Sequence, residues 1–277
     1  HVSYSLSNVA GALFHNFTGG ALGDAPDRAY GTAEWYRQLW RSSRSFALVS
    51  DLTVAILGGG LKTKQKITGR LADALSELYL LSCVLKRYED AGRPTGDDRI
   101  VELAARNALY RFDEAMAGVI DNFPSAPARL LMRTCVFPLG RRRKPASDRL
   151  GREVARLALE PGEIRNRLTR DIYVSKDVND PTGLLEVTLE KVIAAAPVEK
   201  KLEKAIREGK VRRYHGFDWF DEAVETGATE SEAGQLRELE RLVARVIAVD
   251  HFDPAEVRPN YMKPGHNARL TDPMAAE

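Results

Sequence analysis

Three adjacent glycines, Gly58–Gly60, are followed by Lys62, Lys64 and Lys66, and glycines beside lysines could form a loop that holds a phosphate. A P-loop, however, has the pattern G-x-x-x-x-G-K-S/T after a buried strand, whereas these glycines are adjacent and follow a helical pattern. The dinucleotide pattern G-x-G-x-x-G also fails, because Thr63 stands where its third glycine belongs. Since glycine costs about 1 kcal/mol in a helix interior relative to alanine, we predict a break between two helices.

The three lysines then lie in the first turn of the second helix. Cations are disfavoured at this end, where the helix dipole is positive. Their position therefore favours an anion or a neighbouring acidic surface opposite them, although the glycines are better explained as a structural break.

Catalytic and metal-binding patterns do not appear elsewhere in the sequence. The five histidines have no metal-ligand spacing, no serine stands in a G-x-S-x-G motif, and no carboxylate stands out as a general base. We therefore predict no catalytic residue and no metal site, and the sequence does not assign cofactor-binding residues. Cys83 and Cys135 lie among apolar residues, so we expect two buried or inert thiols in a reducing compartment.

A short apolar segment stands beside a basic cluster in ARLLMRTCVFPLGRRRK, residues 128–144. Such apolar side chains can enter the headgroup region of a membrane, and each cation contributes about 1 kcal/mol near anionic lipid. A loop that packs on the core with a basic rim has the same pattern. Nucleic-acid binding is disfavoured, because one aromatic residue lies near the cluster and no known motif surrounds it. The candidate membrane or partner contact comprises Leu131, Met132, Val136, Phe137, Arg141, Arg142, Arg143 and Lys144.

Composition limits the class of protein. With 277 residues the chain can form one large domain or two modest ones, and its 44% hydrophobic and 29% charged residues are ordinary for a helix-rich protein. The formal net charge of +2 gives no argument for a polyanionic partner. No apolar run approaches the roughly 18 residues that span a bilayer, and no signal peptide is recognised. Because a helical pattern begins directly after His1, we expect a fragment that starts inside a helix.

Apolar residues spaced by three and four dominate the chain and predict an all-α fold. The clearest stripe runs from Ile67 to Tyr88 and ends before Gly92 and Pro94, which suit a helix end. A short connection leads to the next helix, so the two should pack as an antiparallel hairpin. We expect helices at residues 34–57, 67–88, 97–122, 147–160 and 183–207, and one or two more within 217–248.

These helices suggest three parts. Residues 1–122 are expected to form a bundle of antiparallel helices, and residues 183–277 a second, smaller helical part with a tail. Residues 123–182 between them are expected to form a connecting segment. This stretch contains several prolines, then an apolar and basic centre, and then the irregular sequence IYVSKDVNDPTG.

The stretch GGGLKTKQKITGRLADALSELYLLSCVLKRYEDAGRP resembles the C-terminal region of large, long-chain bacterial acyl-CoA dehydrogenases of the FadE type. The resemblance continues through NALYRFDEAM, DNFP, VFPLGRR, ASDRLGREVA, NDPTGLLE and DHFDPAE, and thus covers nearly the whole chain in order and spacing. RLADALSELY is also similar to the matching helix of very-long-chain acyl-CoA dehydrogenase, which has its own C-terminal extension.

The resemblance implies an FAD-dependent enzyme of fatty acid β-oxidation that converts a long-chain acyl-CoA into a trans-2-enoyl-CoA. In the family, a glutamate of an E-G-(T/A)-N motif removes the α-proton. Here Glu208 and Gly209 match only its first two letters, at the end of a charged helix. The glutamate and the FAD site are therefore expected in a catalytic core, encoded upstream of His1 or on a separate chain.

By resemblance, the chain packs on that core, favours homodimers and helps the enzyme associate with an anionic membrane surface. The enzyme is then cytoplasmic or peripheral at the inner membrane. The alternative is a free-standing helical module that binds a membrane or a partner without catalysis. Neither hypothesis includes nucleic acid as a partner.

Overall fold

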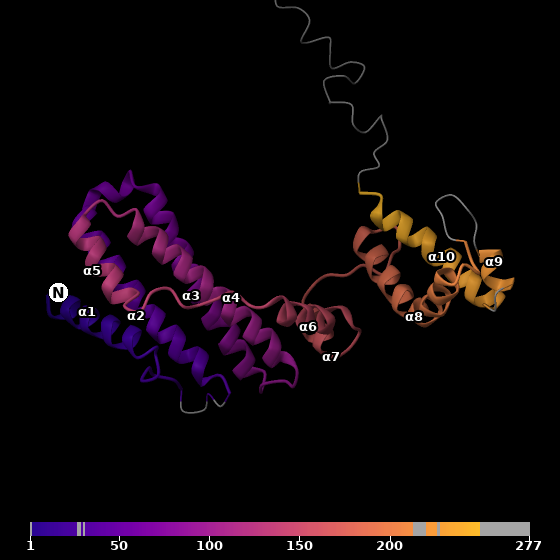
Figure 1. The fold of residues 1–277 in the computed structure, drawn as a ribbon, viewed down its shortest axis with the longest axis horizontal. Coiled ribbons are helices and arrows are strands. Elements are labelled where there is room, and N and C mark those ends of the chain that lie inside the picture. The colour runs from indigo at the N-terminus through magenta and orange to yellow at the C-terminus, as the bar shows by residue number, and fades with distance from the viewer. Residues whose placement is uncertain (1, 27–28, 30, 213–219, 226–227, 250–277) are drawn as a thin grey trace, which may run out of the picture. The chain divides into compact units, whose positions relative to one another are not determined.

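The computed structural model describes residues 2–26, 29, 31–212, 220–225 and 228–249. Within these ranges the chain forms ten α-helices, one short 3-10 helix and no strand, which confirms the predicted all-α fold. The chain divides into two compact units, residues 1–170 (unit 1) and residues 171–277 (unit 2), shown in Figure 1. The boundary falls inside the predicted connecting segment, and the three predicted domain ranges stay a prediction.

Unit 1 contains the first seven α-helices and the 3-10 helix. Their bounds are α1 (Val2–Phe17), α2 (Ala33–Leu57), η1 (Gly58–Lys62), α3 (Gln65–Asp90), α4 (Asp97–Asp121), α5 (Ala126–Val136), α6 (Asp148–Leu159) and α7 (Glu163–Thr169). Helices α2, α3, α4 and α6 confirm the predictions made from apolar spacing, and α1 confirms the helical pattern after His1.

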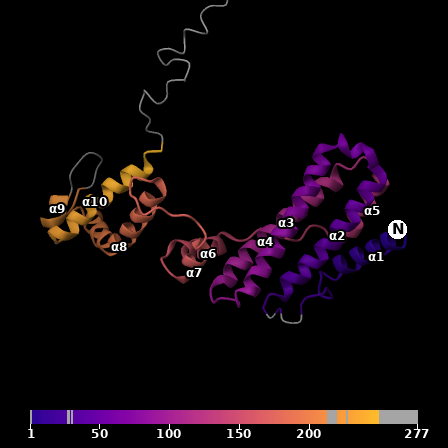
Figure 2. The ribbon, with the colours of Figure 1, turned by 180° about the vertical axis from the view of Figure 1, so that it is seen from behind.

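Helices α3 and α4 form the predicted hairpin and lie side by side in both views (Figures 1 and 2). The turn between them is tight, because Gly92 and Arg93 take left-handed conformations with φ of 76° and 59°. Glycine reaches this region without a Cβ clash. The Arg93 N–H donates to the Tyr88 carbonyl oxygen at 3.0 Å, and the Arg93 guanidinium donates to the Glu89 carboxylate at 2.6 Å. These two bonds hold Arg93 in a conformation that non-glycine residues rarely adopt.

The main core of unit 1 lies where α2, α3, α4 and α5 meet. Large, fully buried side chains fill it, and each contributes about 1.5–3 kcal/mol relative to an exposed position. They belong to a cluster of Val49, Ile67, Ala74, Leu78, Phe112, Met116, Val119, Ile120, Phe123, Ala128, Met132 and Val136. A second cluster continues along the α3–α4 hairpin, so the predicted Ile67–Tyr88 stripe is buried over most of its length.

The glycine stretch forms the predicted break. Gly58 has a φ of 47°, which ends α2, and the residues that follow form a 3-10 turn before α3. A Cβ at Gly59 or Gly60 would meet nothing within 4 Å, so these glycines do not allow another group to approach. Of the three lysines only Lys66 lies within α3, because Lys64 is the N-cap residue of this helix and Lys62 ends η1; the prediction that all three occupy the first turn is therefore wrong for two of them. All three are exposed, and no carboxylate of the described residues pairs with them. Unit 1 as described therefore does not supply the acidic surface that their position favours.

Helix α5 corrects the prediction of an irregular segment after residue 122. Pro127 stands in its first turn, where the missing N–H has no intrahelical partner, so the proline is compatible with the helix. Pro138 lies just beyond the helix end at Val136. The prolines therefore bracket a helix instead of excluding one. Helix α7 was also missed, because its seven residues are too few to show a periodic pattern.

Unit 2 has a hydrophobic core of its own. It contains α8 (Pro181–Arg207), α9 (Phe220–Glu225) and α10 (Glu230–Ile247). The helix predicted at 183–207 is confirmed, and of the one or two helices predicted within 217–248 the structure shows two. The buried residues of this core are Ala195, Leu202, Val211, Phe220, Ala223, Ala228, Ala233, Leu236 and Leu239. The predicted tail lies outside the described residues.

A compact turn sets the start of α8. The Asp180 carboxylate accepts the N–H of Thr182 at 2.8 Å and that of Gly183 at 3.4 Å, which caps the helix, and Pro181 occupies the first turn. A Cβ on Gly183 would lie 2.2 Å from the backbone carbonyl oxygen of Asp177. Glycine is thus required here by a close backbone approach, not by its φ.

Replacing Gly183 with alanine is expected to destabilise unit 2 by about 1–3 kcal/mol, because the backbone of the turn must move to accept the methyl group. The matched control is Gly234→Ala in α10, where a Cβ would meet nothing within 4 Å. Alanine there should stabilise the helix by about 0.5–1 kcal/mol. Urea unfolding followed by circular dichroism measures both changes, and equal effects of the two substitutions would contradict the close approach.

Candidate functional site

The predicted membrane or partner contact runs along α5 and the segment after it, and the structure divides its apolar residues into two groups. Met132 is fully buried and Val136 is 2% exposed, both in the core of unit 1, and Phe137 packs partly against that core. Leu131 is 40% exposed, and its neighbour Leu130, which the prediction did not include, is 69% exposed. Only one face of α5 is therefore available to a partner.

The basic residues are divided in the same way. Arg143 is turned inward with 15% of its side chain exposed; its Nη1 donates to the Asp113 carboxylate at 2.8 Å. Arg141 lies at the surface in an ion pair with Glu114. Arg142 and Lys144 are exposed, and no carboxylate of the described residues pairs with either. Four cations that look equivalent in the sequence thus have different surroundings.

Arg143 belongs to a polar network inside unit 1, which we name the Arg143 network. Its Nη2 donates to Gln38 Oε1 at 2.9 Å, and Arg41 Nη1 reaches the same oxygen at 3.3 Å. Arg41 Nε donates to Asn16 Oδ1 at 2.7 Å, and Asn16 Nδ2 donates to the Cys135 carbonyl oxygen at 3.0 Å. The network therefore links α1, α2, α4, α5 and the basic segment.

Burial determines the protonation properties of this network. It raises the pKa of the Asp113 carboxyl, and the nearby Arg143 and Arg41 oppose the rise. Burial, together with Arg143, lowers the pKa of Arg41 to about 10. A raised pKa means that folding favours the neutral carboxyl, so an ionised Asp113 depends on its two arginines for stability.

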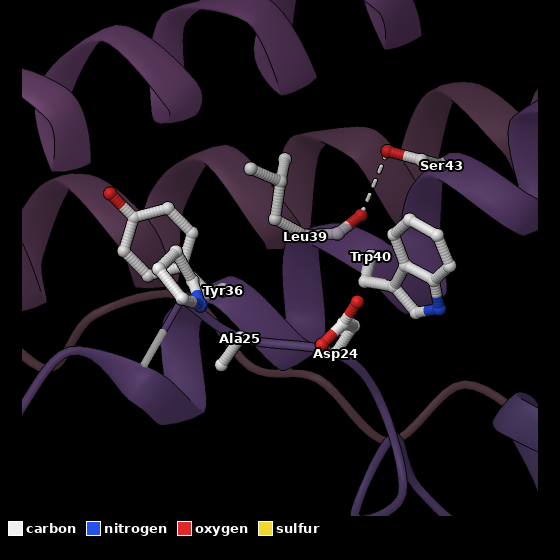
Figure 3. Close-up of a pocket in the computed structure, with 7 residues that line it drawn as sticks. Asp24, Ala25, Tyr36, Leu39, Trp40 and Ser43 are labelled. Atoms are coloured by element: carbon white, nitrogen blue, oxygen red, sulfur yellow. Dashed lines mark hydrogen bonds between the residues drawn. The ribbon is translucent and has the colours of Figure 1, made fainter. Parts of the chain in front are cut away.

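A pocket with aromatic walls lies between α2 and the segment before it (Figure 3). Tyr36 and Trp40, one helical turn apart, flank Leu39, and Asp24 lies opposite them, as Figure 3 shows. The pocket has a volume of about 490 Å³. The Ser43 hydroxyl in this pocket donates to the Leu39 carbonyl oxygen at 3.0 Å, so this serine is not paired with a base that could activate it.

A basic groove of about 650 Å³ lies between the C-terminal half of α3 and α7. Its cations are already engaged: Lys86 pairs with Asp90, and Arg167 donates to Asp97 at 2.8 Å. Cations near the end of α3 are also favoured by the helix dipole. The cations of this groove therefore stabilise the end of the α3–α4 hairpin, and this role explains their presence without a ligand.

The two cysteines differ, although both were expected to be buried or inert. Cys135 is buried in the core, and burial raises the pKa of its thiol. Cys83 is exposed in the basic groove, because it lies on the face of α3 that turns away from α4. The buried apolar neighbours, Leu81 and Leu85, lie on the other face of the helix, whereas Tyr79 and Leu80 share the exposed face with Cys83.

The described residues do not fit FAD. The glycine stretch is a 3-10 turn and not a loop that holds a phosphate, and none of the pockets described above joins a glycine-rich turn to a helix N-terminus. The described part of the chain also contains no group of three metal-ligating side chains. We derive no catalytic step from these residues.

Among the residues that the structure describes, one helical stretch, Ala33–Lys62, is long and apolar enough by composition to cross a membrane, although no uninterrupted apolar run of that length occurs in the sequence. The same test is passed by helices of soluble proteins. In this structure α2 packs against α1, α3, α4 and α5 and buries Leu48 and Val49. Length and composition alone therefore do not decide whether this stretch spans a membrane or packs as a helix of a soluble protein.

Comparison with known families decides the identity of the chain. Residues 1–252 match the model of the family described as acyl-CoA dehydrogenase, C-terminal, bacterial type. The chain belongs to this family. The match confirms the resemblance seen in the sequence, and it makes the chain a C-terminal part of an oxidoreductase of the acyl-CoA dehydrogenase family. No solved structure matches the chain.

In this acyl-CoA dehydrogenase C-terminal domain, the described residues form a helical body held by buried apolar clusters and by the Arg143 network. The Arg143–Asp113 pair, which the sequence did not reveal, fixes the basic segment to α4. One signal was present: Leu109, Asp113, Met116 and Ile120 share one face of α4, so a carboxylate stands in an otherwise apolar stripe.

Proposed function

We propose that the chain is the C-terminal helical extension of an FAD-dependent acyl-CoA dehydrogenase of fatty acid β-oxidation, which converts a long-chain acyl-CoA into a trans-2-enoyl-CoA. The match of the family model to residues 1–252 carries this proposal. The catalytic core would hold the FAD, which would supply a hydride acceptor for the β-carbon, and a glutamate of that core would supply the base for the α-proton. The proposal assigns the chain a structural role, and the buried Arg143–Asp113 pair and the hydrophobic cores of its helices support it.

The coding sequence offers a rapid check of this proposal. If the catalytic core belongs to the same protein, the reading frame upstream of His1 encodes an E-G-(T/A)-N motif within a few dozen codons. If the core is a separate chain, a gene for it exists elsewhere and its product binds this chain. A genome with neither would contradict the proposal.

The exposed face of helix α1 supports a role of this chain in packing against the catalytic core of the enzyme or against a second copy. Its inner face, with Val9 and Ala12, packs near Leu48 and Cys135. Its outer face leaves Phe14 51% and Phe17 65% exposed. A helix that is apolar on two faces usually has two partners. We therefore propose that the outer face of α1 contacts the catalytic core. We also propose that the enzyme forms homodimers in which this face lies at or near the contact between the two copies.

The proposed membrane contact is narrower than the sequence suggested. Met132, Val136 and Arg143 face the interior, so they are not available to lipid in this structure. Exposed residues remain on one face of α5 and in the basic segment. The surface we propose for an anionic membrane comprises Leu130, Leu131, Leu139, Arg141, Arg142 and Lys144.

Replacing both Arg142 and Lys144 with glutamine is expected to weaken binding to vesicles with anionic lipid by about 30-fold, because each cation contributes about 1 kcal/mol near such a surface. Vesicle sedimentation at low salt measures the change. The control replaces Arg149 and Arg152, both exposed on α6, with glutamine, which lowers the net charge equally. Arg143 is left intact, since its loss would destabilise the fold. Equal effects of the two double variants would contradict a localised contact.

The alternative is a free-standing helical module that binds a membrane or a partner without catalysis. Both proposals place the contact with the membrane or partner on the exposed surface of α5. The alternative differs in predicting no flavin in the intact protein and no associated dehydrogenase core.

A further inference from the structure

A small apolar pocket lies between the last turns of α4, α5 and the turn that follows α5. Its volume is about 210 Å³. Ala117 and Ile120 are 7% and 1% exposed and form its inner wall with Phe137. Arg133 and Arg141 also line it, and both are exposed, so they lie at its mouth. An apolar interior with cations at the entrance is the arrangement that suits an amphiphile with a negative head.

The cations at the mouth can exchange their partners. Arg133 pairs with Asp121, which also lines the pocket, and Arg141 pairs with Glu114. All four side chains are between 44% and 61% exposed, and ion pairs this exposed add little stability. Arg142 stands beside Arg141 without a carboxylate partner among the described residues, so the local excess of positive charge favours an added anion.

We propose that this pocket binds one alkyl chain that carries an anionic head group, a carboxylate or a phosphate. The first carbons of the chain lie against Ala117, Ile120 and Phe137, and the head group accepts hydrogen bonds from Arg133 and Arg141. Guanidinium groups bind carboxylate and phosphate oxygens through charge-assisted hydrogen bonds.

The volume limits the ligand. An apolar cavity of about 150 Å³ takes up benzene, a ligand of six carbons, so a pocket of about 210 Å³ is of a size for a chain of about six to eight carbons. Pockets for nucleotides and other drug-sized ligands are larger, about 300–1,000 Å³. The pocket therefore suits a medium-length chain or the first carbons of a longer one.

A chain-length series tests the proposal on the 277-residue chain. Butanoate, hexanoate, octanoate, decanoate and dodecanoate are titrated as monomers by isothermal calorimetry. We expect affinity to rise about fourfold per added methylene until the pocket is full, near octanoate, and then to level off. Alkyltrimethylammonium salts of the same lengths should show no saturable binding. Affinity that keeps rising through dodecanoate, or equal binding of the cationic series, would indicate unspecific adsorption and overturn the proposal.

Two sets of variants locate the site. Arg133→Gln with Arg141→Gln, both at exposed positions, should weaken octanoate binding by at least about tenfold, whereas Arg149→Gln on α6 should leave it unchanged. Ala117→Leu should fill the pocket and abolish binding, with circular dichroism to confirm that the variant is folded. If the double variant binds octanoate like the original chain, the site lies elsewhere and the proposal fails.

The head group could come from a free fatty acid or from a lipid, and competition separates the two sources. Vesicles of phosphatidylglycerol that displace octanoate indicate that a lipid acyl chain enters the pocket. Octanoate binding that vesicles do not affect indicates a free carboxylate as the ligand. Either result supports the pocket, and the second would remove the membrane contact proposed for the neighbouring surface without affecting the assignment to a dehydrogenase.

Discussion

Replacing Arg143 with alanine is expected to lower the free energy of unfolding of unit 1 by about 3–5 kcal/mol, the range for removing one partner of a buried ion pair. The substitution leaves the Asp113 carboxylate buried, with Arg41 as a partial partner. It also leaves Gln38 Oε1 with one donor instead of two. Urea unfolding followed by circular dichroism measures the change.

Arg142→Ala is the matched control, because it stands next in the sequence, has the same side chain and is exposed. Surface substitutions of this kind usually change stability by no more than about 0.5 kcal/mol. A second variant, Asp113→Asn combined with Arg143→Ala, should recover part of the loss, since the buried charge is removed. If the two arginine variants were equally stable, Arg143 would not be the buried member of the cluster.

Replacing Met132 with alanine is expected to destabilise unit 1 by about 2–5 kcal/mol, because Met132 is fully buried in the core and the lost side chain leaves a cavity. The prediction tests the presence of α5, the helix that the sequence did not reveal. A residue in an irregular, solvated loop would show no such effect.

Leu130→Ala is the control for this position, two residues away on the same helix and 69% exposed. It should change the free energy of unfolding by no more than about 0.5 kcal/mol. Similar effects of the Met132 and Leu130 substitutions would mean that α5 is not oriented as described.

Periodic spacing predicted the long helices of unit 1 well. The residues from Ile67 to Tyr88 repeat at three and four, and nothing in the stretch interrupts the helix, so its existence and its buried face follow directly from the sequence. The break at Gly58–Gly60 was equally clear, because glycine disfavours a helix interior wherever it stands.

The candidate site was predicted less well, and the reason lies in contacts between distant residues. Nothing local distinguishes Arg143 from Arg142; they differ because Asp113, 30 residues away, lies on the buried face of α4. The prolines around α5 favour an irregular segment in the sequence, whereas Pro127 is compatible with the helix because it stands in the first turn, a position that spacing alone does not give.

The central claim is that this chain is the C-terminal part of an FAD-dependent acyl-CoA dehydrogenase whose reaction takes place in the catalytic core. The most direct test records the visible spectrum of the intact protein that contains this chain while a long-chain acyl-CoA is added under anaerobic conditions. We predict a flavin band that bleaches on addition, with trans-2-enoyl-CoA as the product, and no flavin band in the 277-residue chain alone. An intact protein without flavin, or a 277-residue chain that binds FAD and is itself reduced, would contradict the claim.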